Sequence, residues 1–147
     1  MSSFPPLEEL IPHAGPMLLL DSMTSWGEGR SSCTLCVRER APFVDDAGEV
    51  ESAVTIEYMA QAVAACLGYE SLRGGGSVRV GMIIACKRFL AHADKLRVGD
   101  VLNIEAKRVR GNEMLSHFDC SVRRGAELFS EATLTLYHAE KPPDDMG

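Results

Sequence analysis

Residues 52–72 constrain the fold more than any other segment of the chain. They contain five alanines, two valines and no proline, and Gly68 is their only glycine. A helix that is apolar on every side is buried on every side. At 1.5 Å per residue, this helix would be roughly 30 Å long. We therefore predict one long central helix, with Ser52 as its N-cap and its end at the glycines of residues 74–76.

The rest of the chain shows the period-two alternation of β-strands, apart from a short helical piece at Leu7–Leu10. The alternation predicts strands over residues 17–26, 31–38, 78–89, 102–107, 114–123 and 128–136. Turns at Gly111-Asn112 and Arg124-Gly125 would join the last three strands as hairpins. One antiparallel sheet wrapped around the helix accommodates every element, which predicts an α+β fold.

The chain has 147 residues, the size of one domain, and no internal repeat divides it. We expect a single domain over residues 1–147, with a disordered tail from about residue 139 to the end. One sheet face and one helix make a small core. We therefore also expect a homodimer or a higher oligomer.

Charge and composition exclude several classes of protein. The net charge of −6 argues against nucleic-acid binding, which needs a basic excess. No stretch reaches the roughly 20 apolar residues of a membrane span, and the first residues lack a signal-peptide pattern, so we expect a cytoplasmic protein. No His, Asp and Glu spacing indicates a metal site, and no cofactor is expected. Cys33 and Cys36 form a CxxC on a predicted strand, where they point to opposite faces, so free thiols are expected.

Glu57 is the most informative single residue. It is the only carboxylate between Ser52 and Tyr69, inside the helix that we predict to be buried. A buried carboxylate without a partner costs several kcal/mol or becomes neutral, so its presence there indicates function. Gln61 lies on the same helix face and could orient it. The alternative is that Glu57 is simply hydrogen-bonded in a polar gap and that Gln61 is an ordinary polar residue of the helix.

Three segments, taken in order, resemble a known family. Residues 11–21 read IPHAGPMLLLD, residues 57–62 read EYMAQA, and residues 81–89 read GMIIACKRF, followed by VGD at 98–100. They are similar to the motifs LPHRYPFLLVD, EAMAQA and GIDKARF…PGD of the β-hydroxyacyl-ACP dehydratases. The resemblance implies a hotdog fold, a long helix wrapped by an antiparallel sheet and paired into a dimer. The EYMAQA helix looks closest to the dehydratases of aryl-polyene-type clusters.

The chain departs from the family pattern at one important position. The family carries a catalytic histidine before the helix, and that position is Phe43 here. Among the remaining residues, His13 is the substitute that we expect to act as the base. The family's glycine at the helix N-terminus falls at Ser52, where the backbone N–H is retained.

The chemistry implied by the resemblance is loss of water from a 3-hydroxyacyl thioester. Charge that develops on the thioester oxygen would be stabilised by N–H groups near Ser52 and Ala53 at the helix start. Glu57 would protonate the departing hydroxyl, and His13 would take the Cα proton unless Glu57 performs both steps. Two alternatives remain open: an acyl-CoA or acyl-ACP thioesterase that uses the same Glu57, and a catalytically silent acyl-binding subunit.

An acyl carrier protein is the expected substrate carrier. Its acidic surface would contact basic residues that lie close together in the sequence, namely Lys87, Arg88, Lys95 and Arg97. An ordinary solvated run of charges is the alternative interpretation of this cluster.

Overall fold

The computed structural model describes residues 4–11, 18–74, 80–111 and 115–139. In chain order, the elements are η1 (Leu7–Glu9), β1 (Ser22–Gly27), β2 (Arg30–Cys36), β3 (Glu49–Glu51), η3 (Ser52–Val54), α1 (Thr55–Arg73), β4 (Val80–Ala91), β5 (Lys95–Arg97), β6 (Val101–Gly111), β7 (Leu115–Arg124) and β8 (Glu127–Ala139). Here η denotes a short 3₁₀ helix.

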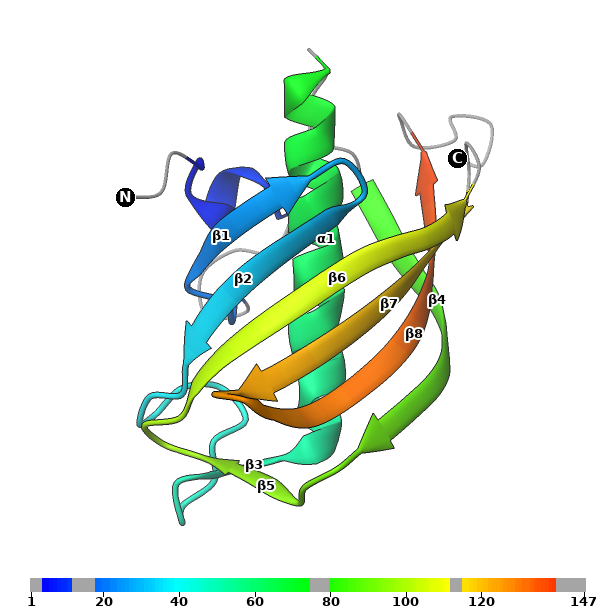
Figure 1. The fold of residues 1–147 in the computed structure, drawn as a ribbon. Coiled ribbons are helices and arrows are strands. Elements are labelled where there is room, and N and C mark those ends of the chain that lie inside the picture. The colour runs from blue at the N-terminus through cyan, green and yellow to red at the C-terminus, as the bar shows by residue number, and fades with distance from the viewer. Residues whose placement is uncertain (1–3, 12–17, 75–79, 112–114, 140–147) are drawn as a thin grey trace, which may run out of the picture.

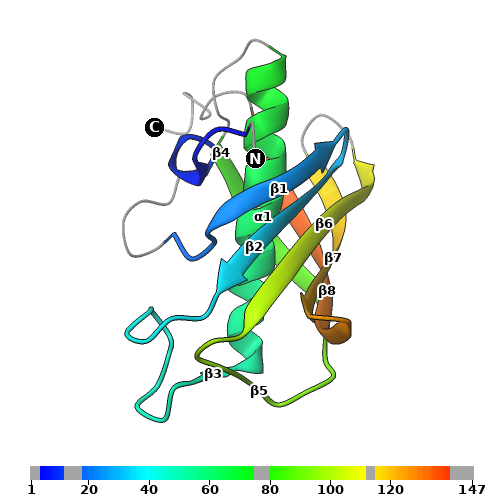
Figure 2. The same ribbon diagram turned by 60° about the vertical axis from the view of Figure 1, so that its left-hand side comes forward.

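The main sheet has six strands in the order β1-β2-β6-β7-β8-β4, and all neighbours are antiparallel. It curves around α1, which runs along its inner face (Figures 1 and 2). The short strands β3 and β5 form a separate pair below the sheet in the view of Figure 1. The predicted α+β arrangement of one antiparallel sheet around one long helix is confirmed.

The core lies between the inner face of the sheet and α1. Ile104, Phe118 and Leu134 of three neighbouring strands are completely buried, as are Met59 and Val63 of the helix. Side chains of a strand alternate between its two faces, so the polar residues between these positions lie on the outer face of the sheet. The face of each of these strands that contacts the helix is thus the apolar face that the sequence alternation predicted.

The N-terminal piece packs against the far half of α1. Leu7 and Leu10 of the η1 region are buried, and a Cβ atom at Gly68 would overlap the carbonyl oxygen of Leu10. The single glycine of the predicted helix therefore allows two backbones to approach each other closely.

The helix starts differently from the prediction. Ser52 opens a 3₁₀ turn, α1 itself begins at Thr55, and no side chain caps either start. Thr55 is responsible locally: its Oγ1 donates to the Ser52 carbonyl over 2.7 Å, which closes a tight turn. The predicted N-cap at Ser52 was therefore wrong. The predicted end was right, since Gly74 is the C-cap of α1.

Two further differences concern short or terminal segments. Strands β3 and β5, of three residues each, were not predicted. The predicted hairpin between the last two strands is present, but its turn lies one residue later than predicted, at Gly125-Ala126, and Gly125 has a φ of 62°, a conformation that favours glycine. Residue His13, the turn residue Asn112 and the predicted tail from residue 140 onward lie outside the described residues. Among the described helices, none is long and apolar enough to cross a membrane.

Candidate active site

Glu57 lies in the first turn of α1 and is half-buried. The preceding 3₁₀ turn places Ser52 and Ala53 at the open N-terminus of the combined helix, with Ser52 half-buried and Ala53 exposed. The first N–H groups of a helix have no acceptor inside it and carry a partial positive charge. The carboxylate and these donors therefore belong to the same end of the same element.

Gln61 holds Glu57 in place. Its Nε2 donates to Oε2 of Glu57 over 3.1 Å, and its Oε1 accepts the backbone N–H of Leu19 over 2.9 Å. A backbone N–H can only donate, so the Leu19 contact fixes which end of the amide faces Glu57. Gln61 is completely buried, which leaves its side chain no competing solvent contact. The predicted orienting contact between the two residues is present.

A second hydrogen bond ties the helix start to the sheet. Oγ1 of Thr55 and Oγ of Ser130 are 2.8 Å apart, and both residues are buried. Ser130 belongs to β8, so the first residue of α1 is fixed against the inner face of the sheet. The position of Glu57, two residues later, is thus set by both the sheet and Gln61.

Tyr58, the neighbour of Glu57, was not singled out by the sequence. It is 3% exposed, and burial raises the pKa of its phenol to about 12. The hydroxyl therefore stays protonated at any physiological pH and can donate a hydrogen bond.

The side chains of two histidines, His92 and His117, are described, and both are hydrogen-bonded to residues other than Glu57. His92 pairs through Nε2 with Glu131 over 2.7 Å, and Nδ1 of His117 lies 2.9 Å from Oγ1 of Thr135. His117 alternates with buried Phe118, so it belongs to the outer face of the sheet, opposite α1. The predicted base His13 lies outside the described residues, and its role stays a prediction.

Phe43, at the position of the family's histidine, lies in the loop between β2 and β3. Phe43 is 50% exposed and its φ is 71°, and Arg40 in the same loop has a φ of 65°. Each left-handed conformation of a residue other than glycine costs about 1–3 kcal/mol. This loop is therefore held in a strained shape next to the helix start.

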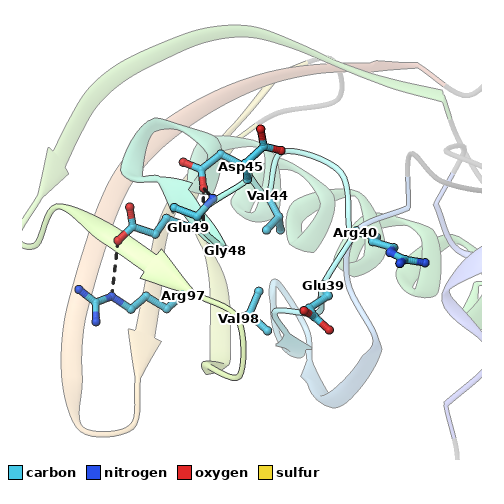
Figure 3. Close-up of a pocket in the computed structure, with 10 residues that line it drawn as sticks. Glu39, Arg40, Val44, Asp45, Gly48, Glu49, Arg97 and Val98 are labelled. Carbon is cyan, nitrogen blue, oxygen red and sulfur yellow. Dashed lines mark hydrogen bonds and ion pairs between the residues drawn. The ribbon is translucent and has the colours of Figure 1, made fainter.

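A large cavity of about 850 Å³ lies between this loop and β5, but it is not the site of Glu57 (Figure 3). Three of its charged residues hold the surrounding backbone and strands together: Oδ1 of Asp45 accepts the N–H groups of Ala47 and Glu49, and Glu49 of β3 pairs with Arg97 of β5 over 3.6 Å. Neither Glu57 nor Gln61 lines it.

The predicted basic cluster is largely neutralised. Arg88 pairs with Glu131, Lys95 with Glu49 and Glu51, and Arg97 with Glu49. Within the described ranges, no group of three or more His, Cys, Asp or Glu side chains is placed to hold a metal ion. The five cysteines are free thiols.

The arrangement provides an oriented carboxylate beside an open helix N-terminus, which is suited to proton transfer next to a developing negative charge. A family model described as ApeP dehydratase matches residues 5–146, nearly the whole chain. The chain belongs to the ApeP-like dehydratase family. The hotdog dehydratase resemblance is therefore confirmed, and the protein is a dehydratase-like lyase.

Solved structures agree on the fold. The dehydratase heterocomplex ApeI:P from Xenorhabdus doucetiae is matched with a TM-score of 0.88 at 20% identity, over 97% of this chain and 94% of that chain. A hypothetical thioesterase with coenzyme A from Streptococcus pneumoniae is matched with a TM-score of 0.66 at 12% identity, over 83% of this chain and 88% of that chain. An uncharacterized protein from Pyrococcus horikoshii is matched with a TM-score of 0.68 at 18% identity, over 94% of this chain and 97% of that chain. No curated protein sequence matches significantly.

Proposed function

We propose that this member of the ApeP-like dehydratases removes water from a 3-hydroxyacyl thioester carried by an acyl carrier protein, in fatty-acid or aryl-polyene-type biosynthesis. The observation that carries the proposal is the Glu57–Gln61–Leu19 hydrogen-bond chain at the start of the central helix, in a chain of this family. A helix carboxylate fixed by a buried amide has one orientation, which general acid–base catalysis requires.

The proposed steps use groups at this end of the helix. A base removes the Cα proton, and the electron pair forms the Cα–Cβ double bond. The Cβ–O bond breaks, and Glu57 gives its proton to the departing hydroxyl, so that water leaves. The backbone N–H groups of Ser52 and Ala53 stabilise the charge on the thioester oxygen meanwhile. His13 is our candidate for the base, with Glu57 acting alone as the alternative.

The direct test is intact-mass spectrometry of a 3-hydroxybutyryl acyl carrier protein incubated with this protein. We expect the carrier to lose the mass of one water and to keep its acyl group. Release of free carrier thiol would instead identify a thioesterase. An unchanged carrier would identify a silent acyl-binding subunit and contradict the proposal.

His13→Ala separates the two versions of the mechanism. A loss of roughly 10²–10⁴-fold in turnover, the scale of one acid–base group, would identify His13 as the base. A loss of less than about threefold would leave Glu57 acting alone or with a base from a second chain. Circular dichroism of the variant checks that the fold is intact.

We further propose that a second chain pairs with β4. This 12-residue strand forms one edge of the sheet, and among the described strands it is bonded only to β8. An unpaired edge of this length is a ready template for another strand. The heterocomplex of the Xenorhabdus doucetiae dehydratase supports a two-chain assembly. Sedimentation velocity at micromolar concentrations should give a dimer, and a persistent monomer would contradict homodimer formation.

The contact with an acyl carrier protein remains a prediction, because three of the four predicted basic residues are paired with carboxylates. Carrier-bound substrate should be turned over more slowly as salt rises, while a small thioester should not be affected. Equal salt dependence for both substrates would argue against charged docking. A cytoplasmic location also stays a prediction.

A further inference from the structure

Two buried hydroxyls meet where α1 begins. Thr55 of the helix and Ser130 of β8 are both fully buried, and their side-chain oxygens are 2.8 Å apart. Replacing such a pair by apolar groups of the same shape is often nearly neutral, because the hydrogen bond mainly offsets the cost of burying the hydroxyls. Stability alone therefore does not explain the pair, and its effect lies in the geometry that its hydrogen bonds impose.

The direction of these hydrogen bonds follows from the number of protons. A hydroxyl has one proton to donate, and a carbonyl oxygen can only accept. Oγ1 of Thr55 donates to the Ser52 carbonyl oxygen over 2.7 Å, so its proton is used there. The Ser130 hydroxyl must then be the donor to Oγ1 of Thr55. The result is a directed chain from Ser130 through Thr55 to the Ser52 carbonyl, in which each hydrogen bond polarises the next.

This chain sets the direction of one peptide group. The Ser52 carbonyl also accepts the backbone N–H of Thr55, so two donors of Thr55 hold it toward the helix. The C=O and N–H of a trans peptide point in opposite directions, and Ala53 supplies the N–H of this one. The Ala53 N–H is therefore directed away from the helix, and Ala53 is exposed. It is one of the first N–H groups of the helix, which have no acceptor inside it.

A second hydroxyl contact between the sheet and α1 differs in this respect. Ser31 of β2 donates to the carbonyl oxygen of Ala62 over 3.2 Å, and both residues are buried. Ala62 lies well inside the helix, where each N–H is bonded to a carbonyl of the preceding turn. Of these two contacts, the Thr55–Ser130 pair alone acts on a peptide whose N–H has no acceptor within the helix.

We infer that Thr55 and Ser130 are positioning residues, whose hydroxyls orient the Ala53 N–H toward the place where negative charge develops on the thioester oxygen. The inference rests on the proposed dehydratase function for what this N–H stabilises. Glu57 is held separately by Gln61, so the acid and the N–H donor have independent buried supports. A donor that is oriented in advance stabilises a developing charge without reorganising during the reaction.

The orientation is tested first without turnover. In a weakly aligned NMR sample, the N–H residual dipolar coupling of Ala53 reports the direction of this bond, and the couplings of residues 60–70 give the helix reference. Thr55→Val keeps the shape of the side chain and removes the hydroxyl, so the Ala53 coupling should shift while the helix couplings stay. Thr55→Ser keeps the hydroxyl and should keep the wild-type coupling.

Two further variants complete this test. Ser130→Ala removes only the outer hydrogen bond of the chain, so it should shift the Ala53 coupling less than Thr55→Val does, and it decides the matter alone if Thr55→Val does not fold. The matched control Ser31→Ala removes the other buried hydroxyl between sheet and helix and should leave the Ala53 coupling unchanged. A wild-type coupling in Ser130→Ala and in folded Thr55→Val, or an equal shift in Ser31→Ala, would overturn the inference.

Turnover of 3-hydroxybutyryl acyl carrier protein gives the second arm. Loss of an oxyanion donor costs about 10²–10³-fold in kcat, so a donor that is only misdirected in Thr55→Val should cost roughly 10- to 100-fold, with little change in KM. Thr55→Ser and Ser31→Ala should stay close to the wild-type rate. Equal losses in Thr55→Ser and Thr55→Val would assign the effect to packing of the methyl group and overturn the inference.

The two arms separate this inference from the proposed function. Wild-type kcat in Thr55→Val would refute the positioning role while the dehydratase function stands. Absence of dehydration by the wild-type protein would refute that function, and the Ala53 coupling would still decide whether the two hydroxyls orient the N–H.

Discussion

The side-chain amide of Gln61 donates to the Glu57 carboxylate over 3.1 Å, one helical turn away on the same face of α1. Because the other end of the amide accepts the Leu19 N–H, the carboxylate is connected through a single buried side chain to the backbone that precedes β1. In the proposed reaction, this connection would make Gln61 a positioning residue that acts only through Glu57.

Gln61→Leu should therefore impair catalysis without changing the titratable groups. A hydrogen bond to a charged group contributes about 1.5–3 kcal/mol, so kcat should fall by roughly 10- to 100-fold, with a small change in KM. The variant also leaves the buried N–H of Leu19 without its acceptor, which should cost about 1–3 kcal/mol of stability. Assays are made well below the melting temperature that calorimetry gives. Wild-type kcat in the folded variant would show that Gln61 is ordinary helix packing.

Gly68→Ala should be strongly destabilising, although alanine is the better helix former. The added Cβ would overlap the carbonyl oxygen of Leu10, and two packed backbones would have to separate. We expect the free energy of unfolding in urea to fall by at least about 2 kcal/mol. The matched control is Gly27→Ala, whose Cβ would meet only the flexible Arg30 side chain at 3.7 Å and should cost far less. Equal effects of the two substitutions would contradict the close approach of η1 to α1.

Stability should decrease at alkaline pH because buried thiols resist ionisation. Burial raises the pKa of Cys33 to about 12 and that of Cys66 to about 11, with the neighbouring thiol and Glu70 as the next causes. In the unfolded chain these thiols lose their protons near pH 8.5. Between about pH 9 and 11 the unfolded state therefore binds fewer protons, and the free energy of unfolding falls as pH rises, by up to about 1.4 kcal/mol per pH unit for each thiol.

Urea titrations between pH 7 and 11 measure this slope. Cys33→Ala removes one titrating group, so its slope above pH 9 should be shallower than that of the wild type by up to about 1.4 kcal/mol per pH unit. Below pH 8 the difference between the two proteins should be constant. Parallel curves up to pH 11 would show that Cys33 is not protected from ionisation by the fold.

The parts of the site that depend on local geometry could be predicted from the sequence. Glu57 and Gln61 are four residues apart, and helix geometry alone brings their side chains together. The contact between Gln61 and Leu19 spans 42 residues, and no local pattern encodes it. The 3₁₀ turn at Ser52 depends on Thr55, whose hydroxyl serves both the Ser52 carbonyl and Ser130 of β8. Strands β3 and β5 escaped prediction because three residues are too few to show a period.

The proposed reaction depends on Glu57, and Glu57→Gln tests it most directly. Glutamine keeps the shape and hydrogen-bonding capacity of the side chain but cannot transfer a proton, and a neutral amide is no harder to bury than a carboxylate. Dehydration of a 3-hydroxyacyl carrier protein, followed by intact-mass spectrometry, should slow by roughly 10²–10⁴-fold in the variant, while its circular dichroism and melting temperature stay close to wild type. Dehydration at the wild-type rate in folded Glu57→Gln would contradict the assignment of this carboxylate as the catalytic acid.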